Sequence, residues 1–387
     1  MKIAYCLNNI NYVGGIENVT VTKANVLAEL DDYEIFIIVS DHEENKGVAA
    51  GLSDSVHLID LDINYYSDDW KSKWNVLKGI LVKRRLHKKR LTKTLYEIQP
   101  DVVISVGQAE KYMLPKIKGN WVTIRELHYC KDFRRLAATS RPMLYKVFAR
   151  LSDYYDYNCK IGKYDGIITL TQEDKDLNWR KTDKVYVIPN PLTFRNNNIS
   201  MLDTKKVIAV GRLSAQKNFL SLICAFRSVA DYYPDWTLEI YGEGNELSIL
   251  QKQIISLHLE NNVYLCGNTS DVQSRICDSS IFVLSSIFEG LPLVMLEAMA
   301  CGLPVVSYDC PCGPKDIIID GVDGFLVSTG DEKMLAEKIC YLIENPDIRT
   351  KIGAAALKKS ENYHIDKIIP MWMTLFERLI AEKRNKC

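Results

Sequence analysis

Two glutamates near residue 290 have the type and spacing suited to holding hydroxyl groups. Glu289 and Glu297 are separated by seven residues, and Gly290, Leu291 and Pro292 directly follow the first of them. Each oxygen of a carboxylate can accept one hydroxyl, and such charge-assisted hydrogen bonds are the stronger kind. Glu289 could therefore accept hydrogen bonds from sugar hydroxyls and Glu297 from a ribose. Without further context, two glutamates at this spacing are more often solvated side chains at the start of a helix than ligand-binding residues.

A strand, a loop and a helix must position these two carboxylates. The apolar run Ile281–Ser285 predicts the strand, Pro292 fits the first turn of the helix, and Gly302 fits its C-terminal cap. In open parallel sheets ligands lie beyond the carboxyl ends of the strands, and the N-terminal amides of the following helix attract anions. The segment therefore predicts a site that a diphosphate fits, with Glu289 in its loop and Glu297 in its helix.

A second strand end offers positive charge. Val207–Val210 has the pattern of a strand, and it leads into Gly211, Arg212 and Lys217. The glycine lets the backbone approach a ligand, and the two cations suit phosphate. Taken alone, Arg212 and Lys217 would be ordinary surface charges. Together with a loop and helix that favour a diphosphate, they indicate the cationic side of the same site.

Several motifs together resemble the retaining glycosyltransferases of family 4, also called glycosyl transferases group 1, of the kind that build bacterial surface polysaccharides. The matching segments are Gly211-Arg212-Leu213 with Gln216-Lys217, Gly242-Glu243-Gly244, Glu289 and Glu297 with Gly290-Leu291-Pro292 between them, Pro189-Asn190-Pro191 and Gly324-Phe325-Leu326-Val327. The resemblance implies that Arg212 and Lys217 contact the donor diphosphate. It also implies that Glu297 holds the ribose and that Glu289 contacts the transferred sugar. Gly290 and Leu291 belong to the same implied donor-binding loop.

Two glycines and a histidine in the first half complete the set of candidate site residues. Gly14 and Gly15 follow the first predicted strand and permit a tight turn before a helix, for which a plain turn is the alternative. The resemblance implies that both glycines lie near the donor phosphates and the acceptor. His128 follows the predicted strand Trp121–Glu126, and the resemblance implies that it is the catalytic histidine that touches the donor sugar. A single histidine without that resemblance is more often structural.

Short apolar runs bounded by turn residues alternate with segments of helical spacing, which is the pattern of parallel sheets covered by helices. We therefore predict an α/β fold of two Rossmann-like domains, and the resemblance implies the GT-B arrangement, in which they face a central cleft. Residues 1–190 are predicted as the acceptor-binding domain and 191–365 as the nucleotide-sugar-binding domain. The amphipathic segment 366–387 is predicted as a C-terminal helix that packs back on the first domain. The predicted strands are Lys2–Leu7, Glu34–Ser40, Val56–Leu61, Asp101–Val106, Trp121–Glu126, Gly166–Leu170, Val185–Ile188, Val207–Val210, Thr237–Tyr241, Val263–Cys266, Ile281–Ser285, Pro304–Ser307 and Gly324–Val327.

Composition and charge are those of an ordinary globular protein. The 387 residues are 47% hydrophobic and 25% charged, and the length exceeds the ~100–200 residues of one domain. The formal net charge is zero, but residues 1–190 hold 29 Lys and Arg against 25 Asp and Glu, and the rest hold 20 against 24. Eleven cysteines without zinc spacing favour a reducing compartment. The sequence shows neither a signal peptide nor the ~18-residue uncharged apolar run of a membrane span, so we expect a cytoplasmic protein.

A basic stretch at residues 71–93 suggests a peripheral partner. It contains ten Lys or Arg and no acid, interleaved with apolar residues. A basic amphipathic helix can lie on anionic lipid, where each cation contributes about 1 kcal/mol, although a solvated helix face is the alternative. The resemblance favours the membrane, because many family members add sugars to polyprenyl-diphosphate-linked or other lipid acceptors at its inner face. Nucleic acid is not expected as a partner, because no recognisable module for it is present.

The resemblance also implies a reaction, namely transfer of a hexose or N-acetylhexosamine from a nucleotide sugar to a saccharide or lipid-linked saccharide with retention of configuration. The segment Ser307–Ile318 resembles members that use UDP-sugars for surface polysaccharides such as lipopolysaccharide or capsule, although Lys315 replaces an acid found in many of them. Arg212, Lys217 and helix amides can stabilise the leaving diphosphate without a metal. No cofactor is therefore expected, and Asp60-Leu61-Asp62 is interpreted as a strand end. A nucleotide-sugar epimerase of the same fold and a non-catalytic nucleotide-sugar-binding protein remain as alternatives.

Overall fold

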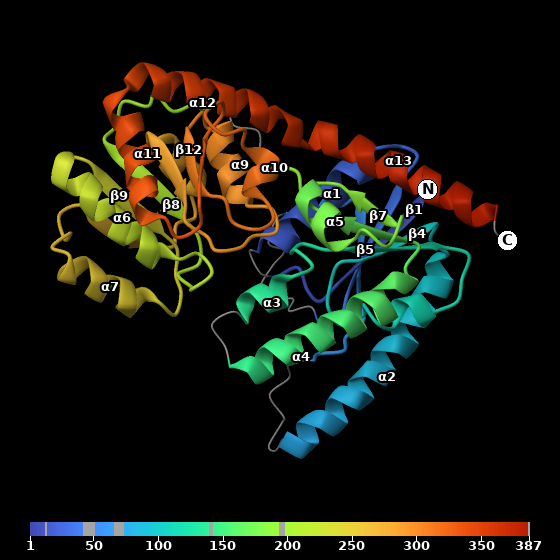
Figure 1. Ribbon diagram of the computed structural model, residues 1–387. Coiled ribbons are helices and arrows are strands. Elements are labelled where there is room, and N and C mark those ends of the chain that lie inside the picture. Colours follow the sequence, from blue (N-terminus) through green and yellow to red (C-terminus); the bar gives the residue numbers. More distant parts are fainter. Residues whose placement is uncertain (12–13, 42–50, 66–72, 139–141, 193–197, 386–387) are drawn as a thin grey trace. The chain divides into compact units, whose positions relative to one another are not determined.

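The computed structural model describes residues 1–11, 14–41, 51–65, 73–138, 142–192 and 198–385, without the side chains of residues 73–78 and 158 (Figure 1). The chain forms two compact units. Unit 1 consists of Met1–Thr169, Asn178–Thr193 and Ile365–Cys387, and unit 2 of Leu170–Leu177 and Phe194–His364. The domain boundaries that we predict from the sequence, after residues 190 and 365, remain a proposal.

Unit 1 is built on a parallel sheet. Within the described residues this sheet has seven strands in the order β3-β2-β1-β4-β5-β6-β7. From β1 the chain adds β2 and β3 on one side of the sheet and then β4 to β7 on the other, so β1 pairs with both β2 and β4. Open α/β sheets bind ligands at such a switch point in strand order. The strands are β1 (Lys2–Leu7), β2 (Glu34–Val39), β3 (Val56–Asp60), β4 (Val102–Ser105), β5 (Val122–Glu126), β6 (Gly166–Thr169) and β7 (Val185–Val187).

Apolar clusters cover both faces of this sheet. In β1, Tyr5 belongs to the cluster that includes Trp372 and Phe376, whereas Cys6 belongs to the cluster that includes Leu91. Successive strand residues point to opposite faces, so a sheet covered on both sides needs continuous apolar runs, and these runs are what the sequence shows. The helical elements are α1 (Gly15–Ala28), α2 (Lys73–Ile98), η2 (Leu114–Lys116), α3 (Phe133–Ala137), α4 (Met143–Tyr154), η3 (Tyr155–Lys160), η4 (Ile161–Lys163) and α13 (Ile365–Arg384).

Unit 2 contains a second parallel sheet. Its described strands follow the order β10-β9-β8-β11-β12-β13, with β8 beside the point where the order reverses. The strands are β8 (Lys206–Val210), β9 (Thr237–Tyr241), β10 (Val263–Gly267), β11 (Ile281–Leu284), β12 (Val305–Tyr308) and β13 (Phe325–Val327). The helical elements are α5 (Gln172–Asn178), α6 (Phe219–Tyr232), α7 (Leu247–Ser256), α8 (Val272–Cys277), α9 (Leu293–Ala300), α10 (Pro314–Ile317), α11 (Glu332–Glu344), α12 (Pro346–Ser360) and η5 (Glu361–Tyr363).

The predicted fold class is confirmed, because both units are Rossmann-like parallel sheets with helices, and every run predicted as a strand contains one. The predicted C-terminal helix is α13, which contacts α1 and β5 of unit 1. One local prediction was wrong: α9 begins at Leu293, and Pro292 is its N-cap, because a ψ of 88° takes that proline out of the helical region. Gly302 does end this helix, with a left-handed φ of +77°.

The described helices include none that is long and apolar enough to cross a membrane. The first two residues of the basic stretch 71–93 lie outside the described residues. The remaining part of this stretch falls within α2.

Candidate functional site

Three loops of unit 2 lie against one another at the carboxyl edge of its sheet. They comprise residues 211–218 after β8, 242–246 after β9 and 285–292 after β11. Leu213 N donates to Glu243 O at 2.9 Å, which joins the first loop to the second. Ile287 N donates to Gln216 O at 2.9 Å, which joins the first loop to the third. The structure therefore brings most of the residues predicted from the second half into one connected group of loops, at the edge where such sheets bind ligands.

An ion pair joins two of the predicted residues. Lys217 Nζ lies 2.6 Å from Glu289 Oε1, and 18% and 8% of these side chains are exposed. Gly211 leaves space for the lysine, because an added Cβ there would lie 3.1 Å from Lys217 Cε. After Glu289, Gly290 is half-buried and Leu291 is buried. The sequence predicts both charged residues but not their pairing, which makes Glu289 the fixed anion against which Lys217 is held.

Arg212 is exposed and lines a cavity of about 290 Å³. The cavity lies where the loops after β8, β9 and β10 meet, and Gly242, Glu243, Asn268 and Thr269 also line it. Its volume is near the lower end of the range of small-molecule sites, which runs from ~300 to ~1,000 Å³. Asn268 and Thr269 are not among the predicted site residues. Their position directly after a predicted strand is the signal that could have found them.

Glu297 lies in the second turn of α9 and is half-buried. Burial raises the pKa of this carboxyl to about 7, and no charged neighbour in the described part of the chain offsets the effect. Near neutral pH the carboxyl therefore exists in both protonation states. A diol that donates hydrogen bonds to Glu297 would favour the ionised state.

A glycine turn supports the loop that carries Glu289. Glu289 N donates to Pro311 O at 3.2 Å. Gly313 has a φ of +134°, and an added Cβ would lie 2.6 Å from Pro292 Cδ. Both the backbone conformation and the lack of space therefore require glycine at this position.

In unit 1, Gly14 and Gly15 lie at the start of α1. Gly14 is the N-cap, with a φ of −121°, and as a glycine it has no side chain to accept a hydrogen bond from the first helix amides. Neither glycine has a left-handed φ, so a tight turn that only glycine can form does not explain them. The start of a helix presents backbone amides that can bind an anion, and here the carboxylate of Glu17 lies against Gly14, where an added Cβ would clash with it.

His128 follows β5 and is held between two polar neighbours of unit 1. Asn190 Nδ2 lies 3.4 Å from His128 Nδ1, and Glu126 Oε1 lies 3.4 Å from His128 Nε2. Only 3% of the imidazole is exposed. Burial lowers the pKa of His128 to about 4, although Glu126 opposes this shift. The imidazole is therefore neutral near pH 7, where it can donate or accept one hydrogen bond at Nε2.

A group of buried charges in unit 1 was not predicted from the sequence. Lys23 and Glu126 form an ion pair, each with 1% of its side chain exposed, and Lys23 Nζ lies 4.3 Å from the centroid of the Trp372 ring. Burial opposes the charge of Glu126, but Lys23 holds the pKa of that carboxyl below its usual range. Arg125 lies 3.8 Å from Glu110 in the same region. Lys23 falls on the buried stripe of α1, which is the signal that a helical projection would have given.

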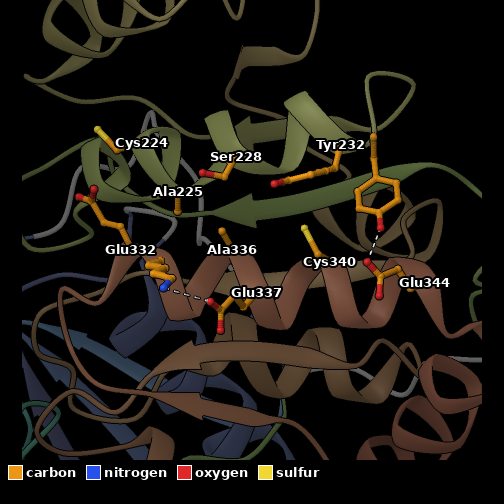
Figure 2. Close-up of a pocket in the computed structure, with 11 residues that line it drawn as sticks. Cys224, Ala225, Ser228, Tyr232, Glu332, Ala336, Glu337, Cys340 and Glu344 are labelled. Atoms are coloured by element: carbon orange, nitrogen blue, oxygen red, sulfur yellow. Dashed lines mark hydrogen bonds and ion pairs between the residues drawn. The ribbon is translucent and has the colours of Figure 1, made fainter.

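A second and larger cavity of unit 2 has the wrong chemistry for a diphosphate. It has a volume of about 630 Å³ and lies between α6 and α11 (Figure 2). Glu332, Glu337 and Glu344 line it, and Lys333, its one described cation, lies 3.8 Å from Glu337. The described residues contain no group of three or more His, Cys, Asp or Glu side chains placed to hold a metal ion. The candidate site is therefore the edge that carries Arg212.

Comparison with known proteins adds to this geometry. Residues 193–359 match the family model described as glycosyl transferases group 1. An uncharacterized glycosyltransferase of Haemophilus influenzae is 31% identical over 386 residues, which cover 96% of this chain and 98% of that protein. The amylovoran biosynthesis glycosyltransferase AmsD of Erwinia amylovora is 30% identical over 220 residues, which cover 54% of this chain and 62% of AmsD.

A solved structure has the same fold. The pneumococcal O-GlcNAc transferase GtfA, in complex with UDP and GlcNAc, superposes with a TM-score of 0.70 and 16% identity. The superposition covers 98% of this chain and 99% of that one.

Proposed function

This chain belongs to the glycosyl transferases group 1 family, and on that premise we propose that it moves a hexose or N-acetylhexosamine from a UDP-sugar to a saccharide or polyprenyl-diphosphate-linked saccharide acceptor. The observation that carries the proposal is the Lys217–Glu289 ion pair on the edge of unit 2 that also carries Arg212. The complex of GtfA with UDP and GlcNAc supports the donor class. The role of AmsD in amylovoran biosynthesis supports a place in surface glycan synthesis.

Each residue of that edge has a role in the proposal. Arg212 and the amides at the start of α9 bind the diphosphate, and Glu297 accepts hydrogen bonds from the ribose. Glu289 accepts hydrogen bonds from the transferred sugar. Lys217, held by Glu289, stabilises the charge that develops on the leaving diphosphate, which is the contribution that preorganised cations make to such reactions. Because these cations can neutralise the leaving group, the proposed reaction needs no metal ion.

The bond changes follow from retention of configuration. The bond between the anomeric carbon and the diphosphate oxygen breaks, and the acceptor oxygen forms its new bond on the same face of the sugar. The acceptor proton passes to the departing diphosphate. In this scheme His128 contacts the donor sugar as a neutral imidazole, and Gly14 and Gly15 offer backbone amides to the phosphates or the acceptor.

The location that we propose is the cytoplasm, with peripheral contact to the inner face of the cell membrane. The contact is made by the basic stretch 71–93, of which residues 71 and 72 lie outside the described residues. Within α2, Arg84, Arg85, Lys88 and Lys89 are exposed. Cations at such positions attract anionic lipid by about 1 kcal/mol each.

A thermal-shift screen against UDP-, GDP- and ADP-sugars tests the donor. A ligand at 100 times its Kd stabilises the protein by about 2.7 kcal/mol, so a UDP-sugar is expected to raise the Tm by several degrees. Glu297→Ala, which removes the proposed ribose contact, should lose that shift. If no nucleotide sugar raises the Tm, the proposal is wrong.

The acceptor is tested next, with lipid-linked saccharides and the donor that gives the largest shift. Formation of an α-configured product from an α-linked donor supports retention, and NMR of the product decides it. Conversion of the donor alone into an epimer, without any acceptor, would instead favour the epimerase class.

A further inference from the structure

The helix α4 presents a row of large apolar side chains to solvent. Leu144 is 80% exposed, Phe148 is 71% exposed and Leu151 is 64% exposed. Val147 and Tyr154 are exposed beside them. These positions are three or four residues apart, so they form one continuous stripe on the helix. Contiguous apolar patches on a protein surface mark binding sites, whereas single exposed apolar residues are ordinary.

The opposite face of α4 explains why this stripe points outward. Asp153 is buried on that face and accepts a hydrogen bond from Arg134 at 3.2 Å. Arg134 also bonds Ser152 Oγ at 3.0 Å and pairs with Asp156, which follows the helix. Lys111 lies 3.4 Å from the same Asp156. The helix is therefore attached to unit 1 through its polar face, and its apolar face has no place in the core.

The surface charges of residues 143–163, the segment that carries the stripe, are of one sign. Both acids between residues 143 and 163, Asp153 and Asp156, are buried in the ion pairs just described. The cations of this segment reach the surface, fully or in part: Lys146, Arg150, Lys160 and Lys163. A second copy of the chain docked on this face would bring these cations against one another. An anionic surface would attract them.

The basic helix α2 covers the same face of the sheet. Leu91 and Leu95 of α2 share an apolar cluster with Tyr157 and Ile161, which follow α4 in the chain. Figure 1 shows α2 and α4 on the side of the unit 1 sheet opposite α1 and α13. On this side of the unit 1 sheet, α4 carries the exposed apolar stripe, and both α2 and the segment 143–163 carry exposed cations.

We propose that this face is a lipid-binding surface, with the apolar stripe of α4 inserted among the headgroups and acyl chains of an anionic bilayer. A helix with an apolar face and a basic rim lies in the membrane interface in this manner. Tyr145, Tyr154 and Tyr155 are exposed on α4 and just after it, where their rings reach apolar lipid and their hydroxyls stay in water. The choice of lipid rests on the membrane location proposed above, whereas the exposure of the stripe does not depend on that proposal.

Vesicle co-sedimentation of the full-length protein tests the proposal without any transfer reaction. The vesicles contain phosphatidylcholine with phosphatidylglycerol, or phosphatidylcholine alone. The test variant is Leu144→Gln/Phe148→Gln/Leu151→Gln, and its matched control is Ile249→Gln/Ile255→Gln on α7, where both isoleucines are also exposed. We expect the wild type and the control to bind the anionic vesicles and the test variant to lose at least tenfold in affinity.

Insertion is measured separately, with a variant that leaves the rest of the stripe intact. Brominated acyl chains should quench Phe148→Trp more strongly than the wild type, which has six native tryptophans, whereas Tyr232→Trp, at an exposed position of α6, should show no such increase. Equal vesicle binding by the test variant and wild type would overturn the proposal. Absence of the expected quenching in Phe148→Trp would also overturn it. A third contrary result would be a wild-type dimer in light scattering that the test variant no longer forms, with no vesicle binding by either protein. Failure to transfer sugar to any acceptor would refute the proposed function and leave these results standing.

Discussion

At the scale of single residues, Glu297 is a group whose charge changes near neutral pH. Its pKa is about 7 in the free protein, so below pH 7 the carboxyl is mostly protonated. Holding a ribose diol as a carboxylate then requires release of that proton. Affinity for a UDP-sugar should therefore fall about tenfold for each pH unit below 7 and level off above it.

Calorimetry between pH 5.5 and 8 measures this dependence, and buffers of different ionisation enthalpy report the released proton. A UDP-sugar is used because its diphosphate does not titrate in this range. Glu297→Gln is the control, with weaker binding that does not vary with pH. Affinity of the wild type that stays constant or rises toward low pH would contradict the role given to Glu297.

Substitution of Glu289, which pairs with Lys217, should affect turnover more than UDP binding. Glu289→Gln removes the charge that we propose contacts the sugar and keeps the shape of the loop, so kcat should fall by about 10²-fold, as when a preorganised transition-state contact is lost. Affinity for UDP should stay the same or increase, because Lys217 is released toward the phosphates. Glu297→Ala should instead weaken UDP binding. Steady-state kinetics and calorimetry distinguish the two, and an equal loss of UDP affinity in both variants would rule out the assignment.

At the scale of elements, close packing of two strand-end loops depends on Gly242. It has a φ of +138°, and an added Cβ would lie 2.0 Å from Gly211 O. Gly242→Ala should lower the free energy of unfolding by about 3–5 kcal/mol, because it adds both backbone strain and a clash with the main chain. Gly330→Ala is the matched control, with a φ of +86° and nothing within 4 Å of an added Cβ, and should cost about 1–2 kcal/mol. Urea unfolding measures both, and equal losses would show that space at Gly242 is not limiting.

The buried pair of Lys23 with Glu126 links α1 to β5. Lys23→Met leaves Glu126 as a buried charge without its partner, which should cost about 3–5 kcal/mol of unfolding free energy. Lys23→Met/Glu126→Gln removes both charges and should recover most of that loss. Thermal and urea unfolding of the two variants test this. A double variant as unstable as the single one would mean that packing against Trp372, rather than charge, is what Lys23 provides.

Buried strands could be predicted from the sequence, whereas contacts between distant loops and the orientation of a surface helix could not. Strands such as β4 were predictable because burial on both faces demands an uninterrupted apolar run. The pairing of Lys217 with Glu289 was not, because the two are 72 positions apart and meet only when two loops pack together. The exposed stripe of α4 was not predictable either, since the spacing of its apolar residues is the same as that of a buried helix. Its orientation is set by Arg134, whose acidic partners no local pattern reveals.

At the scale of the whole molecule, α13 completes the core of unit 1 after the chain has formed most of unit 2. Ile368, Trp372, Phe376 and Leu379 are buried against that core. Each contributes about 1.5–3 kcal/mol by leaving water, and a domain is stable by only about 5–15 kcal/mol. Deletion of residues 365–387 should therefore unfold unit 1 and leave unit 2 folded.

Hydrogen exchange with mass spectrometry locates that effect. The deletion should give fast exchange in β1 and β4 and retain protection in β8 and β11, with the UDP-sugar still bound by unit 2. Trp372→Ala, a milder change, should accelerate exchange in the same strands of unit 1. Faster exchange confined to unit 2 would contradict the assignment of α13.

The placement of α13 also has a consequence for the order in which the protein is made. A ribosome releases residues 194–364 before the last helix, so unit 2 can fold while unit 1 still lacks Trp372 and Phe376. The core of unit 1 is thus the first to be synthesised and the last to be completed. Until α13 packs, its apolar surface remains exposed and can be bound by chaperones. A message cut short near its end would yield a chain with a folded unit 2 and an unfinished unit 1. Such a product is one that cellular proteases would remove.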